Sequence, residues 1–354
     1  MSGAAGQDGA LRPLGRTGLS VPRIVYGVSC LGNLYEALPL ETKRGIAAAW
    51  FQASDARPVA IDAAGKYGAG LALEVVGDSL RGLGVPPKDV LLSNKLGWLR
   101  VPLESEEPTF EPGVWADLRH DAVQRISHDG ILECWEQGLQ LLGAPYRPQL
   151  ASVHDPDEYL AASTDDEDRR SRLDDVLGAY AALHELKERG EVAAVGVGAK
   201  DWRVIEELSQ QIDFDWVMLA NSLTIYRHPP ELLDFVGGLA GRGVGVINSA
   251  VFNAGFLVGG RFLDYRVATP ETDSQAFAWR QTFHKLCARH DVPPTVACVQ
   301  FGLAAPGVAA VALNTSAPSR VLDNARSVEQ QAPAAFWQDA KAAGLVDPAC
   351  DFVG

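Results

Sequence analysis

Four polar side chains of types that transfer protons lie where strands are predicted to end. Asp62 closes the apolar run "PVAID", Lys95 closes "VLLSNK" and His154 closes "QLASVH"; Tyr67 follows shortly after Asp62. A free tyrosine loses its proton near pH ~10, and a cation beside it stabilises the phenolate. With Lys95 beside it, held by Asp62, Tyr67 is suited to protonate a carbonyl oxygen or to remove a hydroxyl proton. His154 is suited to bind the same oxygen.

Each of these residues alone has a simpler interpretation. A lone Asp62 would be a helix cap or a turn residue, and a lone Tyr67 a packing aromatic. Lys95 alone suits a surface amine or a Schiff-base lysine of the aldolase type, and His154 alone suits a loop contact. Their joint occurrence at three successive strand ends favours a catalytic cluster. Because this cluster carries no electrons, we expect a bound hydride donor or acceptor beside it. Lys66 is expected to be solvent-exposed.

Eight short apolar runs alternate with amphipathic segments along the chain. Little polar alternation within the runs favours parallel strands covered on both faces. The predicted strands are 23–29, 58–62, 90–95, 149–154, 192–198, 216–221, 243–249 and 308–313. The predicted helices are about 41–53, 71–83, 129–142, 172–189, 201–210, 229–241, 273–290 and 318–330.

This alternation predicts an α/β fold, a TIM (β/α)8 barrel, in which the carboxyl ends of all strands open onto one face. The competing fold is an open doubly wound sheet, but no GxGxxG follows the first strand. Before that strand, "LRPLGRTGLSVPR" predicts a β-hairpin across one barrel mouth, with Gly15 and Gly18 in its turn.

Long loops are predicted at the carboxyl-end face, at 97–128 and at the acidic stretch 155–171. Residues 1–10 are expected to form a disordered tail, and 11–354 one barrel domain. The last segment, 330–354, is expected to hold one short helix and to be able to fold over the pocket.

Composition limits the function further. The chain has 354 residues, of which 47% are hydrophobic, so it is able to bury a large core; its net charge of −14 argues against nucleic acid or an anionic membrane as partner. No apolar run approaches the ~18 residues of a membrane-spanning helix. Five widely spaced cysteines without a CxxC pair favour the cytoplasm. The histidines lack metal-ligand spacing, so we expect no metal. We expect the partner to be a small-molecule substrate. Nothing in the sequence indicates an oligomeric state.

Several segments resemble the aldo-keto reductase superfamily. "DAAGKYGAGLALEVVG" (62–77) resembles its signature, "LLSNKLG" (91–97) the segment of its lysine and "SVHDPD" (152–157) the segment of its histidine. "NTSAPSRVLDNARS" (314–327) is similar to the segment that binds the cofactor's adenosine. The likeness covers about 11–330. It implies a TIM barrel, an NAD or NADP cofactor, and a catalytic tetrad of Asp62, Tyr67, Lys95 and His154.

Two further segments, 127–143 and 248–260, are similar to the L-fucose, D-threo-aldose and L-galactose 1-dehydrogenase group. Gly198 and Ala199 match the Ser-Asn pair that holds the nicotinamide amide in most family members, and Asn248 matches a tyrosine that commonly stacks on the nicotinamide. On the pyrophosphate side the resemblance carries over to Ser249, Phe252, Asn253, Gly255 and Leu257.

In the adenosine segment, Asn314 matches a lysine that pairs with the NADP 2'-phosphate in many relatives. Arg320, Asp323 and Asn324 keep the family pattern of arginine, acid and asparagine. Loss of a cation opposite a dianionic phosphate weakens NADP binding, so we expect NAD, with NADP possible through Arg320.

The resemblance implies an NAD(P)-dependent oxidoreductase that oxidises the C1 hydroxyl of an aldose to a lactone, with Tyr67 as proton acceptor. Trp98, Trp115 and Tyr159 lie on predicted loops at the active mouth, where they would stack on substrate. Within the family, the alternatives are pyridoxal 4-dehydrogenase and a general aldehyde or ketone reductase. Outside enzyme function, the alternative is a cofactor-bound redox sensor without turnover; a Schiff-base aldolase acting through Lys95 is a further option.

Overall fold

The barrel is described by a computed structural model of residues 11–53 and 55–354, so the tail expected at 1–10 lies outside the described residues. Eight parallel strands close on themselves in the order β10-β11-β14-β3-β4-β5-β8-β9. Their bounds are β3 Ile24–Gly27, β4 Val59–Ala64, β5 Val90–Leu96, β8 Leu150–His154, β9 Ala194–Ala199, β10 Trp216–Ala220, β11 Gly245–Ser249 and β14 Val308–Leu313. Nearly all strand residues are buried. The predicted TIM (β/α)8 barrel is therefore confirmed.

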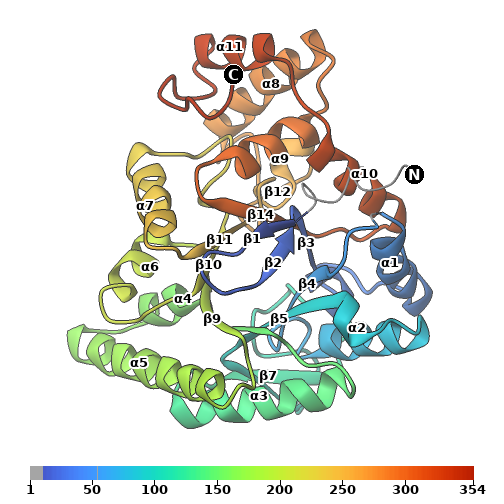
Figure 1. Cartoon of the computed structure of the whole chain (residues 1–354), viewed down its shortest axis with the longest axis vertical. Coiled ribbons are helices and arrows are strands. Elements are labelled where there is room, and N and C mark those ends of the chain that lie inside the picture. Colours follow the sequence, from blue (N-terminus) through green and yellow to red (C-terminus); the bar gives the residue numbers. More distant parts are fainter. Residues whose placement is uncertain (1–10, 54) are drawn as a thin grey trace, which may run out of the picture.

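Helices surround the barrel (Figure 1). They are α1 Leu40–Gln52, α2 Leu71–Gly82, α3 His128–Leu142, α5 Asp166–Glu188, α6 Trp202–Leu208, α7 Pro230–Gly241, α9 Pro294–Ala304 and α10 Pro318–Glu329. α3 shows how the sequence sets one of them. The Ser127 side chain caps it by accepting a bond from the Gly130 amide, and Ile131, Cys134 and Trp135 are buried at helical spacing.

One predicted helix is two helices in the structure. Residues 273–290 were expected to form the connection before β14, but α8 (Ser274–Arg289) is followed by α9, which starts at Pro294. Proline fits the first turn of a helix, where its missing amide is not needed. α9 is apolar nearly throughout and largely buried, so no amphipathic period marks it in the sequence.

The C-terminal segment forms the expected short helix, α11 (Ala334–Ala342), but in a different place. Figure 1 shows α11 beside α8, outside the ring of helices. His290 Nε2 lies 2.9 Å from Asp339 Oδ2, and the Phe336 ring packs against His290. The expectation that this segment folds over the pocket is wrong, because its apolar side chains are buried against α8 and α9.

The N-terminal hairpin closes the other end of the barrel. β1 (Leu11–Pro13) and β2 (Ser20–Pro22) pair antiparallel, and the hairpin lies across the centre of the view in Figure 1. Leu14 is fully buried in the layer at the amino ends of the strands, which includes Leu91 and Trp216. Gly15 has φ +55° and lies against the Gly243 carbonyl, where a Cβ atom would be 2.4 Å from the oxygen. The expected turn glycine is thus required by both backbone conformation and space.

The two long connections contain regular structure. In 97–128, β6 (Trp98–Pro102) and β7 (His120–Gln124) form an antiparallel ribbon. The stretch 155–171 was expected to be a loop, but it holds α4 (Pro156–Ala161) and the first turn of α5. Asp165 caps α5 by accepting from the next amides, and acidic residues fill the first turn. Carboxylates are favoured there by the helix dipole, so the acidic run is a helix start that the sequence reading missed.

Within the described ranges no helix combines the length and apolar character needed to span a bilayer.

Candidate active site

The structure brings the four predicted proton-transfer residues to one end of the barrel. Asp62 and Lys95 lie on adjacent strands β4 and β5, and His154 ends β8, which pairs with β5. Lys95 Nζ forms a buried ion pair with Asp62 and lies 4.8 Å from the centroid of the Tyr67 ring. The His154 ring meets the Tyr67 ring edge-on at 5.4 Å. Parallel neighbouring strands thus bring together side chains that are distant in the sequence.

The turn that carries Tyr67 depends on glycine. Gly68 has φ +62°, and a Cβ atom there would lie 2.2 Å from the Gly32 carbonyl oxygen. Conversely, a Cβ atom on Gly32 would lie 2.6 Å from the Tyr67 carbonyl. The backbone after β4 therefore packs directly on the 3-10 turn Ser29–Gly32, which fixes the direction of the Tyr67 side chain.

The protonation states of the ring pair follow from their surroundings. Burial, with the charges of Asp62 and Asp155, raises the pKa of Tyr67 well above its usual value. Burial, with the positive charges of Lys95 and Lys66, holds the pKa of His154 well below its usual value. The sequence pointed to Lys95 as a stabiliser of the phenolate. In the structure its charge is paired with Asp62, and burial outweighs it. The resting site holds a neutral phenol and a neutral imidazole.

A cavity of about 130 Å³ opens beside this pair. Small residues at the ends of β9 and β10, namely Gly198, Ala199 and Ala220, line one wall with Met218. Trp115, which donates from Nε1 to Glu111 at 2.7 Å, also lines the cavity. The arrangement places a proton donor and a hydrogen-bonding imidazole against a space that a small organic molecule can enter.

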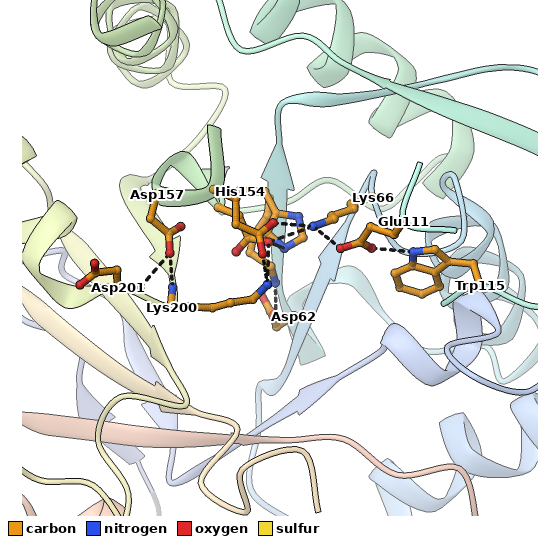
Figure 2. Close-up of polar contacts among 11 residues, drawn as sticks. Asp62, Lys66, Glu111, Trp115, His154, Asp157, Lys200 and Asp201 are labelled. Carbon is orange, nitrogen blue, oxygen red and sulfur yellow. Dashed lines mark hydrogen bonds and ion pairs between the residues drawn. The ribbon is translucent and has the colours of Figure 1, made fainter. Parts of the chain in front are cut away.

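Lys66 is buried, contrary to the expectation that it is exposed. Only 4% of its side chain is accessible, and its Nζ lies 2.8 Å from Glu111, 3.1 Å from Asp155 and 3.2 Å from Glu158. Figure 2 shows the Lys66 ammonium directed at Glu111 on one side and toward the His154 region on the other. The sequence reading treated Lys66 as one residue of an exposed turn, whereas three carboxylates from later segments surround it.

The predicted aromatic substrate contacts separate into two groups. Trp115 lines the cavity. Trp98 packs on Phe110, with the Lys66 ammonium 5.2 Å from its ring centroid, and Tyr159 donates its hydroxyl to Asp175 at 2.7 Å. Neither Trp98 nor Tyr159 lines the cavity. Both rings are held by neighbours that a linear sequence does not reveal.

Other cavity residues were missed. Asp155 and Lys200 line it directly after the carboxyl ends of β8 and β9, so a search for every charge at a strand end would have found them. Glu111 stands within a long connection and Tyr265 in the turn between β12 (Phe262–Leu263) and β13 (Arg266–Val267). Tyr35 donates its hydroxyl to the Tyr265 carbonyl at 3.3 Å. No local pattern marks these last three.

The predicted cofactor residues at the end of β11 and in the loop after it differ in whether they line the cavity or are buried in the core. Ser249 lines the cavity, whereas Leu257 is fully buried in the core. Asn253 is buried and donates to Asp264 at 3.0 Å. The amide of Gly255 is bonded to the Phe252 carbonyl within the loop. The amides of Asn253 and Leu257 are likewise bonded to carbonyls of the same loop, so the loop satisfies these backbone donors internally.

The predicted adenosine residues lie around the start of α10. Asn314 follows β14 and donates to the Ser29 hydroxyl at 2.8 Å; Ser29 in turn lines the cavity. Arg320 is exposed in the first turn of α10, Asp323 is exposed one turn further on, and Asn324 is buried. Asn314 and the α10 start thus lie at the same end of the barrel as the cavity.

A parallel eight-stranded barrel with a phenol, an amine, a carboxylate and an imidazole at the carboxyl ends of its strands is the architecture of a TIM-barrel enzyme. A sequence model described as "Aldo/keto reductase family" matches residues 23–344. The chain belongs to the aldo/keto reductase family, and it is an oxidoreductase. The resemblance read from the sequence is confirmed.

Three curated relatives match most of the chain. Pyridoxal 4-dehydrogenase of Microbacterium luteolum is 27% identical over 347 residues, 95% of this chain and 97% of the relative. D-threo-aldose 1-dehydrogenase of a Pseudomonas species is 27% identical over 337 residues, 93% of this chain and 96% of the relative. L-galactose dehydrogenase of Arabidopsis thaliana is 23% identical, covering 90% of this chain and 88% of the relative.

Solved structures share the fold. The holo form of aldo-keto reductase AKR11C1 from Bacillus halodurans superposes with a TM-score of 0.68 at 21% identity, covering 95% of this chain and 96% of that one. Glycerol dehydrogenase AKR11B4 of Gluconobacter oxydans gives a TM-score of 0.67 at 15% identity, covering 96% and 98%.

Proposed function

We propose that this enzyme is an NAD-dependent dehydrogenase that oxidises the C1 hydroxyl of an aldose to a lactone. The observation that carries the proposal is the meeting of Tyr67, Lys95 and His154 at one cavity. The similarity to D-threo-aldose 1-dehydrogenase over 93% of the chain supports an aldose as substrate.

The residues present fit a nicotinamide cofactor. Gly198, Ala199 and Ala220 leave the cavity wall free of bulky side chains beside Tyr67, which suits a flat ring. The exposed Arg320 at the start of α10 suits a phosphate, because a helix amino terminus favours anions. A nicotinamide held there would supply a hydride acceptor for C1 of the sugar.

The chain's own residues then handle the proton. In oxidation the deprotonated form of Tyr67 accepts the proton of the C1 hydroxyl as the hydroxyl oxygen becomes the lactone carbonyl oxygen, and in the reverse reaction the neutral phenol returns that proton. Lys95, held by Asp62, stabilises the transient phenolate. His154, kept neutral, donates a hydrogen bond to the same oxygen and fixes its position.

Pyridoxal is the second candidate substrate. Pyridoxal 4-dehydrogenase is as similar as the aldose enzyme, and the Trp115 ring in the cavity wall suits stacking on a pyridine as well as on a sugar. General aldehyde or ketone reduction uses the same proton donor. A redox sensor without turnover requires no such cluster, so the cluster argues for catalysis.

The test is a spectrophotometric screen of aldoses and pyridoxal with NAD and NADP. We expect NAD reduction with an aldose, and a kcat lower by about 10²–10⁴-fold in Tyr67→Phe. Preference for pyridoxal would replace the aldose by the second candidate. Full activity in Tyr67→Phe would refute the proton transfer.

The cofactor choice is tested separately. We propose NAD because Asn314 is uncharged and directed to Ser29, which leaves Arg320 as the cation of the predicted set for a 2'-phosphate. Comparing kcat/KM for the two cofactors decides between them, and a strong NADP preference would contradict the proposal. We also propose a cytoplasmic location, which fits the buried, unbridged cysteines of the chain; cell fractionation checks it.

A further inference from the structure

The most strongly connected charge near the cavity is one that the mechanism above does not use. Lys66 Nζ reaches three carboxylates within 3.2 Å: Glu111, Asp155 and Glu158. They come from the long β6–β7 connection, the residue after β8 and helix α4. Lys66 itself is the residue before Tyr67. One buried ammonium therefore joins the turn of Tyr67 to the β6–β7 connection and to the start of α4.

Asp155 links this ammonium to His154. Its Oδ2 lies 3.1 Å from Lys66 Nζ and 3.6 Å from His154 Nε2. The backbone holds it there: Asp155 has φ +50°, and its amide donates to the Gly198 carbonyl at 2.8 Å. His154 Nδ1 is buried without a partner among the described residues, so the contact with Asp155 is at the Nε2 edge.

A buried carboxylate this close to an imidazole would favour imidazolium if nothing balanced it. The imidazolium would pair with Asp155 and direct its Nε2 proton there, away from a substrate oxygen. Lys66 supplies the balancing charge at short distance. Lys200 contributes a second positive charge, with its Nζ 3.8 Å from the same Asp155 oxygen.

We propose that Lys66 is a positioning residue: its ammonium binds the Asp155 carboxylate, leaves the His154 imidazole neutral with its Nε2 edge available to the substrate oxygen, and fixes the Glu111 segment that carries Trp115. The inference rests on the proposed function for the role of the substrate oxygen. The charge balance at His154 is independent of it.

The other charges that face His154 act in known directions. Lys95 from β5 and Lys200 after β9 lower its pKa as Lys66 does, and Glu158 from α4 raises it. Tyr67 contacts the ring as a neutral phenol. The positive charge of Lys95 is offset by Asp62. Loss of Lys66 therefore leaves Asp155, Glu158 and Glu111 with Lys200 as the remaining cation of the network, and the net effect at His154 is upward.

The experiment is an NMR titration of histidine side chains in the cofactor-free full chain, with His154 assigned through His154→Gln. The variants are Lys66→Met, Lys66→Gln and Lys66→Arg, together with Lys66→Met/Asp155→Asn. Lys88→Met, at an exposed lysine, is the control. Two charge-free variants are made so that the test does not depend on the folding of one of them. The side-chain amide of Lys66→Gln can still hydrogen-bond the buried carboxylates, whereas Lys66→Met cannot. Circular dichroism verifies folding.

We expect His154 to stay neutral down to low pH in the parent protein and in Lys66→Arg. Its titration should move up by about one unit or more in the charge-free variants. Removing Asp155 as well should reverse most of that shift. An unchanged His154 titration in a folded Lys66→Met or Lys66→Gln protein overturns the proposal, as does an equal shift with and without Asp155.

Turnover separates this inference from the proposed function. With a substrate found in the screen, Lys66→Met should lower kcat about 10-fold or more at neutral pH. Lys66→Arg, which keeps the positive charge, should retain most of the parent kcat. If Tyr67→Phe kept full activity while His154 still responded to Lys66, the proposed function would fail and the charge balance would stand. If Tyr67→Phe were inactive while the His154 titration did not change on loss of Lys66, the proposed function would stand and the charge balance would fail.

Discussion

A Cβ atom on Gly198 would lie 2.9 Å from the Cδ atom of Lys95, closer than two carbon atoms normally pack. Gly198 is the register partner of His154 across β8 and β9, so the lysine stem passes over a strand position that carries no side chain. The glycine at position 198 thus makes room for the Lys95 stem.

Gly198→Ala should therefore displace the Lys95 ammonium from Tyr67. We expect kcat to fall about 10-fold or more, because small misplacements of catalytic groups are costly, while the protein remains folded. Gly237→Ala, on α7 with open space around the added Cβ atom, is the matched control. It should keep activity and gain slightly in stability, since alanine is the better helix former. Equal activity in the two variants would contradict the proposed role of Gly198.

The buried ion pair of Lys95 and Asp62 predicts a pattern in a double-mutant cycle. Both side chains are nearly inaccessible, at 3% and 4% exposure. Lys95→Met leaves a buried carboxylate alone and should lower the free energy of unfolding by about 3–5 kcal/mol. Lys95→Met/Asp62→Asn should regain much of that stability but no activity. Urea unfolding and kcat measure the two effects; independent, additive losses of stability would show that the pair does not interact.

The raised pKa of Tyr67 predicts opposite pH behaviour in the two reaction directions. The phenol keeps its proton through neutral pH, so carbonyl reduction should be nearly constant from about pH 6 to 9. Oxidation needs the deprotonated form, so its kcat/KM should rise with pH across that range. His154, whose pKa is lowered, stays neutral across this pH range, so its titration adds no further change to either pH profile. Oxidation that slows as pH increases would be incompatible with Tyr67 as base.

Asp157 predicts a stability effect away from the proton donor. Its Oδ2 accepts from the amides of Lys200 and Asp201, its Oδ1 has no partner among the described residues, and burial together with Asp155 raises its pKa to about 6. The folded state thus binds the proton more tightly than the unfolded state. Stability from this group is present below about pH 4 and is lost as pH rises through about 6.

Asp157→Asn should remove that dependence and raise the free energy of unfolding at pH 7 by about 1–3 kcal/mol. Urea unfolding at about pH 4.5 and 7.5 measures it. Asp213→Asn, at an exposed aspartate, is the control and should change stability little. No gain at the higher pH would mean that the carboxylate is ionised at no cost in the folded state.

The strand ends show how much of the site local sequence can predict. Asp62, Lys95 and His154 each close an apolar run, and in a parallel barrel that fact alone sends all three to one face. α9 escaped prediction because full burial removes the amphipathic period. The start of α5 escaped because its acidic first turn reads as a loop unless the helix dipole is considered.

The sequence by itself determined the barrel and the four side chains at its rim, because periodicity and strand ends are local properties of the chain. Only the tertiary structure decided the surroundings of Lys66: three carboxylates from later segments turn a lysine read as exposed into a buried ion-pair centre. The tertiary structure also decided that the pKa of Tyr67 is raised. It placed Trp115 in the cavity wall and left Trp98 and Tyr159 outside it. Burial and charge pairing depend on groups distant in sequence, and no local pattern contains them.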